Sequence, residues 1–300
     1  MKKAWLLIFS AVRIFASLIS FSSCFYLNPG SPNSINYVRY DDAEKYSIGN
    51  FSYSGDGIEK IEIDWVSGEI NVIQTGESVF SVFESGEDLE KSQQLHYMSD
   101  GKTLMIKYCK SHYSGIIDPE QKKLNIEIPK GIDLEINAVS ADIFSGMLEL
   151  NDISLSTVSG KSNLTKAYAD ELQISSVSGD IFVSYAMAHE DISLESVSGK
   201  ITVEYADAKE IDVESVSGNV GLGISDVKDA SIDTTSGNIE LTLIGDCGIT
   251  LDYSTTSGKF SADGDYSNGT RKCVVKASTV SGDLITKRSA VERNAFDFWG

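Results

Sequence analysis

The stretch Asp191-Ile-Ser-Leu-Glu-Ser-Val-Ser-Gly-Lys-Ile-Thr-Val203 decides the fold. Its central Val-Ser-Gly, with close variants, recurs nine times in the 300 residues. From Ser140 onward, successive serines are separated by 19, 19, 20, 19, 19, 21 and 24 residues. Repetition this regular indicates one structural unit copied along the chain. The repeated serines and the glycines that follow them, which we expect to form structural corners, are Ser67, Gly68, Ser140, Ser159, Gly160, Ser178, Gly179, Ser198, Gly199, Ser217, Gly218, Ser236, Gly237, Ser257, Gly258, Ser281 and Gly282.

Apolar residues take fixed places around each serine. In the copy centred on Ser198, Ile192 and Leu194 lie six and four residues before it, and Ile201 and Val203 lie three and five after it. A spacing of two is typical of β-strands. The apolar positions are even before the serine and odd after it, so the phase changes at the corner. We expect the glycine to permit the bend or bulge that this change needs.

A single unit of this kind cannot bury its apolar side, but stacked copies can, with equivalent strands pairing about 4.8 Å apart. The sequence therefore predicts an all-β, single-chain β-solenoid, similar to a parallel β-helix, with repeats of about 19–21 residues and Ser-Gly corners. A β-propeller is the alternative, although its blades need roughly 40–50 residues.

The repeat divides the chain into five segments. We expect an export signal over 1–24, a polar tether over 25–57, irregular coils or a β-cap over 58–130, regular repeats over 131–288, and a tail or cap over 289–300. Phe296, Phe298 and Trp299 in that tail are expected to cover the last coil.

The first 24 residues combine a basic start, Lys2-Lys3, with an apolar stretch and the small residues Ser22 and Ser23 before Cys24. This pattern is typical of export signals. Its end resembles a bacterial lipoprotein signal, which implies lipidation of Cys24 and a cell-membrane or cell-surface location. An ordinary cleaved signal and an uncleaved N-terminal anchor are the alternatives. After this stretch, the chain has no apolar run long enough to span a bilayer.

Charge narrows the choice of partners. The chain carries 44 Asp and Glu against 25 Lys and Arg, a net charge of −19. Nucleic acids and anionic lipid surfaces require clustered bases, so we expect neither, and we expect membrane contact only through the N-terminal anchor. The remaining partner classes are an envelope or host-surface glycan or protein.

The cysteines left after Cys24 are Cys109, Cys247 and Cys273. Cys247 lies ten residues before Ser257, and Cys273 lies eight before Ser281. Neighbouring coils would bring these two cysteines close with an offset of two residues, which leaves a disulfide open. Cys109 is expected to be a small, half-buried apolar residue.

The serine column allows a structural and a functional interpretation. The corner serine and the hydroxyl residue two before it share the parity of the apolar side. We therefore predict an inward ladder of hydroxyls that satisfies the corner backbone. The alternative is a flat outward array, as in ice-binding or carbohydrate-binding surfaces.

Residues able to do chemistry are scattered. His96, His112 and His189 occupy unrelated repeat positions, where surface histidines are expected, and no carboxylate pair stands out. Asp180 and Asp283 follow Ser-Gly, but lysine or asparagine takes that place in other copies, which argues against a repeated calcium site. We therefore expect no enzyme activity, no catalytic or metal-binding residues and no cofactor.

Three features carry a family resemblance: the entry Ile58-Glu-Lys-Ile-Glu-Ile-Asp-Trp-Val-Ser-Gly68, the step Ile128-Pro-Lys-Gly131, and the repeated Val-Ser-Gly with flanking Ile-x-Val. Together they resemble the bacterial putative-adhesin β-strand-repeat family, a domain of unknown function, over about residues 58–286. The resemblance implies an envelope-associated, non-enzymatic β-solenoid and brings no catalytic residues. We expect a binding, adhesion or envelope-organising protein. The alternatives are a polysaccharide-acting enzyme on a β-helix and a passive surface spacer.

Overall fold

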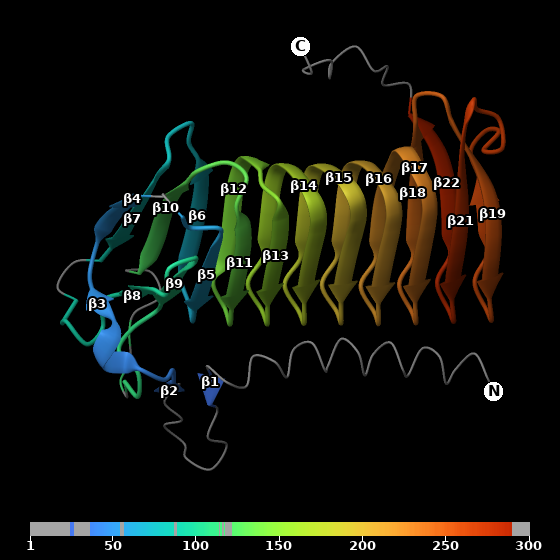
Figure 1. Ribbon diagram of the computed structural model, residues 1–300. Coiled ribbons are helices and arrows are strands. Elements are labelled where there is room, and N and C mark those ends of the chain that lie inside the picture. The colour runs from blue at the N-terminus through green and yellow to red at the C-terminus, as the bar shows by residue number, and fades with distance from the viewer. Residues whose placement is uncertain are drawn as a thin grey trace.

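The computed structural model describes residues 25–26, 37–54, 57–86, 89–113, 115, 117 and 122–289. The export signal with Cys24 and most of the C-terminal tail lie outside these residues. Two short strands, β1 (Phe25–Tyr26) and β2 (Tyr37–Val38), pair antiparallel, and all other strands among the described residues belong to one 20-stranded sheet. The sheet is wound into a stack of coils that lie side by side along one axis (Figure 1). The β-solenoid predicted from the repeat is confirmed.

Each coil has two faces, named here by their place relative to the Ser-Gly corner. The pre-corner face contains, in spatial order, β9 (Thr103–Lys107), β5 (Lys60–Trp65), β11 (Asp133–Ala138), β13 (Asp152–Thr157), the second halves of β14 (Ser162–Ser176), β15 (Ile181–Ser196), β16 (Ile201–Ser215) and β17 (Val220–Thr234), then β21 (Arg271–Thr279) and β19 (Cys247–Thr255). All these strands pair in parallel, copy on copy.

The post-corner face runs alongside it. It contains β10 (Lys123–Ile128), β6 (Glu69–Gln74), β12 (Asp142–Glu149), the first halves of β14 to β17, then β18 (Ile239–Ile244), β22 (Leu284–Ser289) and β20 (Phe260–Ala262). Side chains of both faces point into one aliphatic core, in which Ile192, Leu194, Ile201 and Val203 are buried. Burial of each such side chain stabilises the stack by about 1.5–3 kcal/mol.

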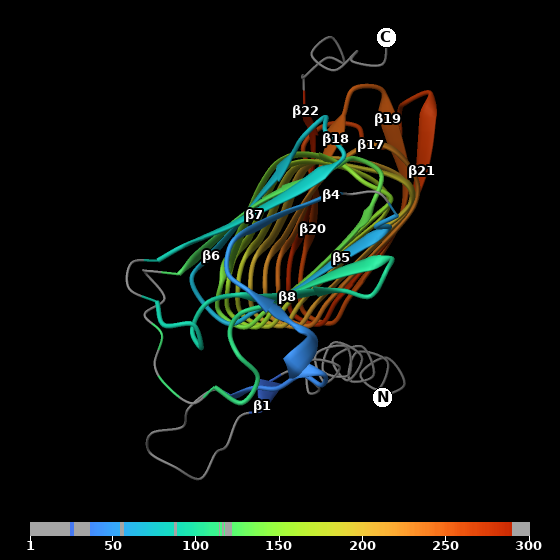
Figure 2. The same cartoon turned by 60° about the vertical axis from the view of Figure 1, so that its left-hand side comes forward.

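Antiparallel strands close the N-terminal end of the stack. β7 (Val79–Ser85) pairs with β10 and with β4 (Phe51–Ser54), while β8 (His96–Ser99) pairs with β9 and with β3 (Ser47–Ile48). Figure 2 shows these strands across the near end of the flattened tube. They form hydrogen bonds with the backbone N–H and C=O groups that would otherwise be exposed at an open sheet edge.

Residues 37–54 are part of this cap. The sequence predicts a polar tether over 25–57, but Val38 and Tyr40 are buried in the core, and the 3-10 helix η2 (Ala43–Lys45) lies between β2 and β3. Tyr40 Oη donates a hydrogen bond to the Cys109 carbonyl at 3.1 Å. The aromatic side chains of this segment therefore hold it against the first coil, and the tether prediction is wrong for it.

The order of the coils differs from the order of the sequence at both ends. At the C-terminal end, β21 and β22 lie between the coil of β17 and β18 and the coil of β19 and β20 (Figure 1). At the N-terminal end, β5 and β6 lie between the later strands β9 and β10 and the next coil, β11 and β12. The expectation that each repeat pairs with the next repeat along the chain holds from Ser67 to Ser236 but fails at the C-terminal end, where the Ser236 copy pairs with the Ser281 copy.

The corner glycines are required by close packing and not by an unusual backbone angle. A Cβ added to Gly199 would lie 2.0 Å from the carbonyl oxygen of Gly179 in the neighbouring coil. Gly199 has no positive φ, whereas Gly68 at the first corner has a φ of 96°. The expected bend is present, but its glycine serves the stacking of corner on corner.

Candidate functional site

The corner serines from Ser140 onward face outward, whereas Ser67 at the first corner is buried. Ser198 and Ser217 are exposed, and each hydroxyl donates a hydrogen bond at 3.2 Å to a carbonyl of the preceding coil, on Val177 and Val197 respectively. The prediction that this serine points inward is wrong for these copies. The strand ends two residues before the serine, as β15 ends at Ser196, so the alternation of inward and outward side chains does not extend to the corner. The hydroxyl nevertheless has a structural partner in the ladder.

The hydroxyl residue two places earlier does point inward. Thr157 and Ser196 are fully buried. Thr157 Oγ1 accepts the Gly160 N–H at 3.0 Å, and Ser196 Oγ donates to the Gly199 carbonyl at 2.9 Å. These side chains satisfy the corner backbone.

The residue after the corner glycine joins neighbouring coils. Asp180 Oδ1 accepts the backbone N–H of Lys200 at 2.9 Å, and Asp283 Oδ1 accepts that of Lys259 at 2.8 Å. Asn219 does the same for Asn238. The Ser-Gly-Asp motif is thus a backbone cap, and within the described residues no group of three or more His, Cys, Asp or Glu side chains could hold a metal ion.

Cys247 and Cys273 are buried and free, so the disulfide left open by the sequence is not formed. The register places Cys247 opposite Arg271 and Cys273 opposite Ile249. Two residues along the strand and one coil across separate the Cα atoms by about 8 Å, beyond the roughly 7 Å limit for a disulfide. Burial raises the pKa of Cys273 to about 12 and also raises that of Cys247, which keeps both as thiols.

The three histidines lie apart in the fold. His96 on β8 is buried, contrary to the expected surface position, and burial lowers its pKa. His112 Nδ1 lies 3.1 Å from Ser111 Oγ, but that hydroxyl donates to the Tyr40 carbonyl. The serine proton is therefore held by the backbone, and this pair has no arrangement for nucleophilic attack.

The most buried charges lie at the N-terminal end of the stack, between the cap and the coils of β5–β6 and β9–β10. Lys122 forms an ion pair with Glu84, and its Nζ lies 5.1 Å and 4.4 Å from the ring centres of Trp65 and Tyr108. Burial lowers the pKa of Lys122 and raises that of Glu84. Tyr108 Oη lies 2.9 Å from Ser67 Oγ at the first corner. This cluster fills the space where the β9–β10 coil lacks a Ser-Gly corner.

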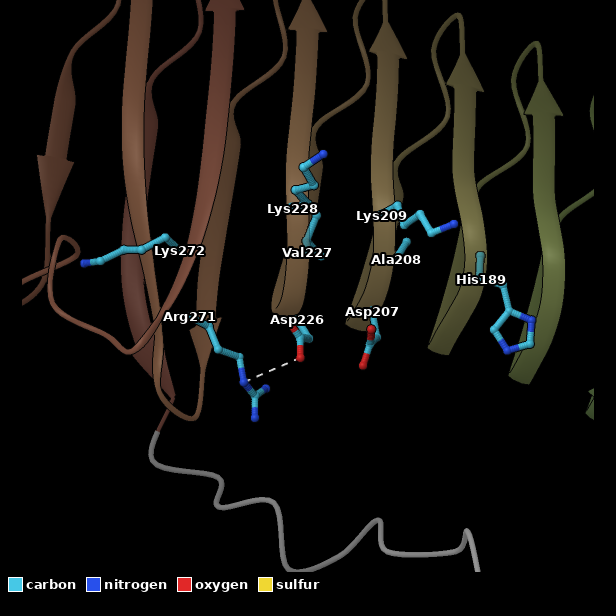
Figure 3. Close-up of a pocket in the computed structure, with 10 residues that line it drawn as sticks. His189, Asp207, Ala208, Lys209, Asp226, Val227, Lys228, Arg271 and Lys272 are labelled. Atoms are coloured by element: carbon cyan, nitrogen blue, oxygen red, sulfur yellow. Dashed lines mark ion pairs between the residues drawn. The ribbon is translucent and has the colours of Figure 1, made fainter.

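A shallow groove of about 500 Å³ runs where the coils return from the post-corner to the pre-corner face (Figure 3). Asp207, Lys209, Asp226 and Lys228 line it from β16 and β17, with Arg271 from β21. Arg271 Nε lies 3.5 Å from Asp226 Oδ2, and Lys209 pairs with Glu190 in the adjacent coil. Two of the groove's cations are thus paired with carboxylates of a neighbouring coil, although the lining as a whole, which includes Lys272, has more cations than carboxylates.

The outward side of the pre-corner face is acidic. Its carboxylates lie in register from coil to coil, as in the row Glu195, Glu214 and Asp233. Lys60 and Lys107 provide counter-charges at the N-terminal end, where Lys107 forms a buried ion pair with Asp64.

The outward side of the post-corner face carries a strip of aromatic and methionine side chains, which we call the aromatic strip. Its members come from β12, β14, β15 and β16, four strands adjacent in the stack. The strip consists of Phe144, Met147, Tyr168, Phe182, Tyr185, Met187 and Tyr205. Met147 is 47% exposed, and the others are half-exposed. The Tyr185 and Tyr205 ring centres lie 5.5 Å apart.

The aromatic strip is absent from the sequence-based predictions for a physical reason. Odd positions after the serine point inward up to position five, and by that rule Tyr185 and Tyr205, at position seven, would also point inward. The structure has two consecutive outward residues there, and the next inward residues are the small Ala186 and Ala206. Alanines at the eighth and tenth positions of several copies were the signal of this shift.

Comparisons with known proteins agree with this architecture. The model of a family described as Toastrack DUF4097 matches residues 58–286. A crystal structure of a "putative lipid binding protein" from Parabacteroides distasonis is 19% identical with a TM-score of 0.52, covering 79% of this chain and 95% of its own. A "putative adhesin" from the same organism is 13% identical with a TM-score of 0.50, covering 81% and 97%. Identities this low show the fold alone. No curated protein matches the sequence.

Proposed function

The chain belongs to the Toastrack DUF4097 family, and from this premise we propose that it is an exported β-solenoid that binds a component of the cell envelope without transforming it. The observation that carries the proposal is the aromatic strip. Aromatic and methionine side chains gathered on one outward face, with polar residues around them, are typical of a binding surface. A stack of paired coils holds such side chains in fixed positions, so little order has to be gained on binding.

The N-terminal sequence supports a place at the envelope. The basic and apolar start followed by Ser22, Ser23 and Cys24 is suited to export and to a lipid anchor on Cys24. Within the residues that the structure describes, no helix has the length and apolarity to cross a bilayer. If the anchor is a lipid on Cys24, C24A should move the protein from the membrane fraction to the soluble fraction. Retention of C24A in membranes would instead indicate an uncleaved N-terminal anchor.

Binding and catalysis can be separated in one incubation. The purified protein is mixed with insoluble peptidoglycan and a panel of insoluble polysaccharides. Co-sedimentation is measured together with the release of new reducing or unsaturated sugar ends. We expect co-sedimentation without release. Release of ends would contradict the proposal in favour of a polysaccharide-acting enzyme, and the absence of both signals would favour a passive spacer.

A further inference from the structure

We infer that the aromatic strip binds a neutral glycan chain laid along the axis of the stack, across β12, β14, β15 and β16. This inference rests on the proposed binding function and names the class of its ligand.

The strip is organised in rows that run from coil to coil. In one row, Phe144, Asn163, Phe182 and Thr202 follow one another in register. Apolar rings and hydrogen-bonding side chains thus alternate along the axis, at the coil spacing of about 4.8 Å. A pyranose ring presents C–H groups on its faces and hydroxyls around its rim, so a glycan chain offers both kinds of contact in the same alternation.

A second row provides a continuous platform. Met147, Lys166, Tyr185 and Tyr205 lie in register, and the Tyr185 and Tyr205 rings are tilted by 38° to each other. Lys166 Nζ lies 5.7 Å from the centre of the Tyr185 ring, so its alkyl chain extends the platform on that side. Successive sugar rings can stack on these neighbouring side chains without any movement of the backbone.

Charge favours a neutral ligand. At the margin of the strip, Glu149 forms an ion pair with Lys130, and Glu204, which accepts a hydrogen bond from Ser184 Oγ, offsets the charge of Lys166. The pre-corner face, in contrast, carries rows of carboxylates, and the whole chain has a net charge of −19. An anionic polymer would be repelled by this field, and a cationic one would be drawn to the other face.

The same alternation argues against a lipid surface as the ligand. Asn163 and Thr202 interrupt the apolar side chains of the first row, and the aromatic residues are half-exposed rather than protruding. A membrane-inserting face needs a continuous apolar area, since any polar group buried in lipid without a partner is costly.

The test uses the full chain with two soluble neutral probes, cellohexaose and chitohexaose, and measures affinity by calorimetric titration. The double variant Y185A/Y205A removes the platform, and F83A is the matched control, because Phe83 is 55% exposed on β7, outside the strip. We expect the wild type and F83A to bind at least one probe, with higher affinity for the hexaose than for its disaccharide. Y185A/Y205A should lose affinity by about fivefold or more, because two stacking rings are removed.

Two further measurements keep the outcome interpretable. Y185F/Y205F should bind within a few fold of the wild type, because the stacking rings remain, and the melting temperatures should show that all variants are folded. Failure of both probes to bind, or equal binding by Y185A/Y205A, would overturn the inference. If Y185A/Y205A sediments with envelope polysaccharide as the wild type does, the aromatic strip is not the binding site, while the proposed envelope-binding function stands.

Discussion

Gly199 lies where the corner of one coil passes directly over the corner of the coil before it. A methyl group there would approach the Gly179 carbonyl oxygen to 2.0 Å, a distance that forces the two coils apart. Gly221, on the outward side of β17, has no atom nearer than 4.0 Å to the position of an added Cβ. The two glycines differ in packing while both lie in the regular part of the stack.

G199A should therefore lower the free energy of unfolding by about 1–3 kcal/mol, the usual cost of overpacking. G221A, as the matched control, should leave it unchanged or slightly higher, because alanine reduces the entropy of the unfolded chain. Chemical denaturation monitored by circular dichroism measures both. Equal stability of G199A and the wild type would show that the corners are not held by close contact.

Like charges stand directly opposite one another on the strands of the pre-corner face. Glu214 on β16 lies in register with Glu195 on β15 and with Asp233 on β17. Opposed like charges destabilise a sheet by roughly 0.2–1 kcal/mol per pair. The apolar core offsets this repulsion together with polar contacts of the row, such as the hydrogen bonds that Ser231 and Ser278 donate to Asp233.

E214Q removes the central charge and should raise the melting temperature. Added salt should raise the melting temperature of the wild type more than that of E214Q, because screening weakens the same repulsion. The matched control is E204Q on the post-corner face, where Ser184 donates a hydrogen bond to Glu204. E204Q should give no gain. A lower melting temperature for E214Q would contradict the repulsion argument and indicate that the carboxylate is held by an attractive contact.

The strands and corners were predictable because each coil repeats the same apolar positions, so nine copies report on one local geometry. The direction of Tyr185 and Tyr205 was not predictable by extending that rule. It depends on two consecutive outward residues in the middle of a 15- or 16-residue strand, which hydrophobic spacing around the serine does not show. The aromatic strip is the result of this shift, and it is therefore a property of the folded coil.

The order of the last coils could not be predicted either, because the copies centred on Ser257 and Ser281 match the repeat equally well. The burial of side chains follows the observed order. Val275 and Ala277 of β21 and Leu284 of β22 are buried, whereas Phe260 of β20 is 39% exposed and Leu251 of β19 is half-buried. In the described part of the chain, the inner coil of β21 and β22 is covered by a coil on each side, whereas the coil of β19 and β20 pairs with a coil on one side only.

A solenoid whose coils followed the order of the sequence would have β21 at its end, whereas here β21 lies inside the stack. Strand β21 pairs with β17 on one side and with β19 on the other. In the described part of the chain, β19 has a strand partner on one side only, although the Tyr266 carbonyl accepts the Ile249 N–H at its start. In a parallel pair alternate amides point to each side, so half of the amides over 251–255 face the end of the stack.

Amide hydrogen exchange of the full chain should therefore be slower over 275–279 than over 251–255, although the first segment is nearer the C-terminus. Exchange reports local opening, and a strand held on both sides opens only when its neighbours do. Strands β15 and β16 in the middle of the stack provide the internal reference for full protection. Faster exchange over 275–279 than over 251–255 would mean that β19 lies inside and β21 at the edge. The exchange pattern therefore decides directly between the inserted order and the sequential one.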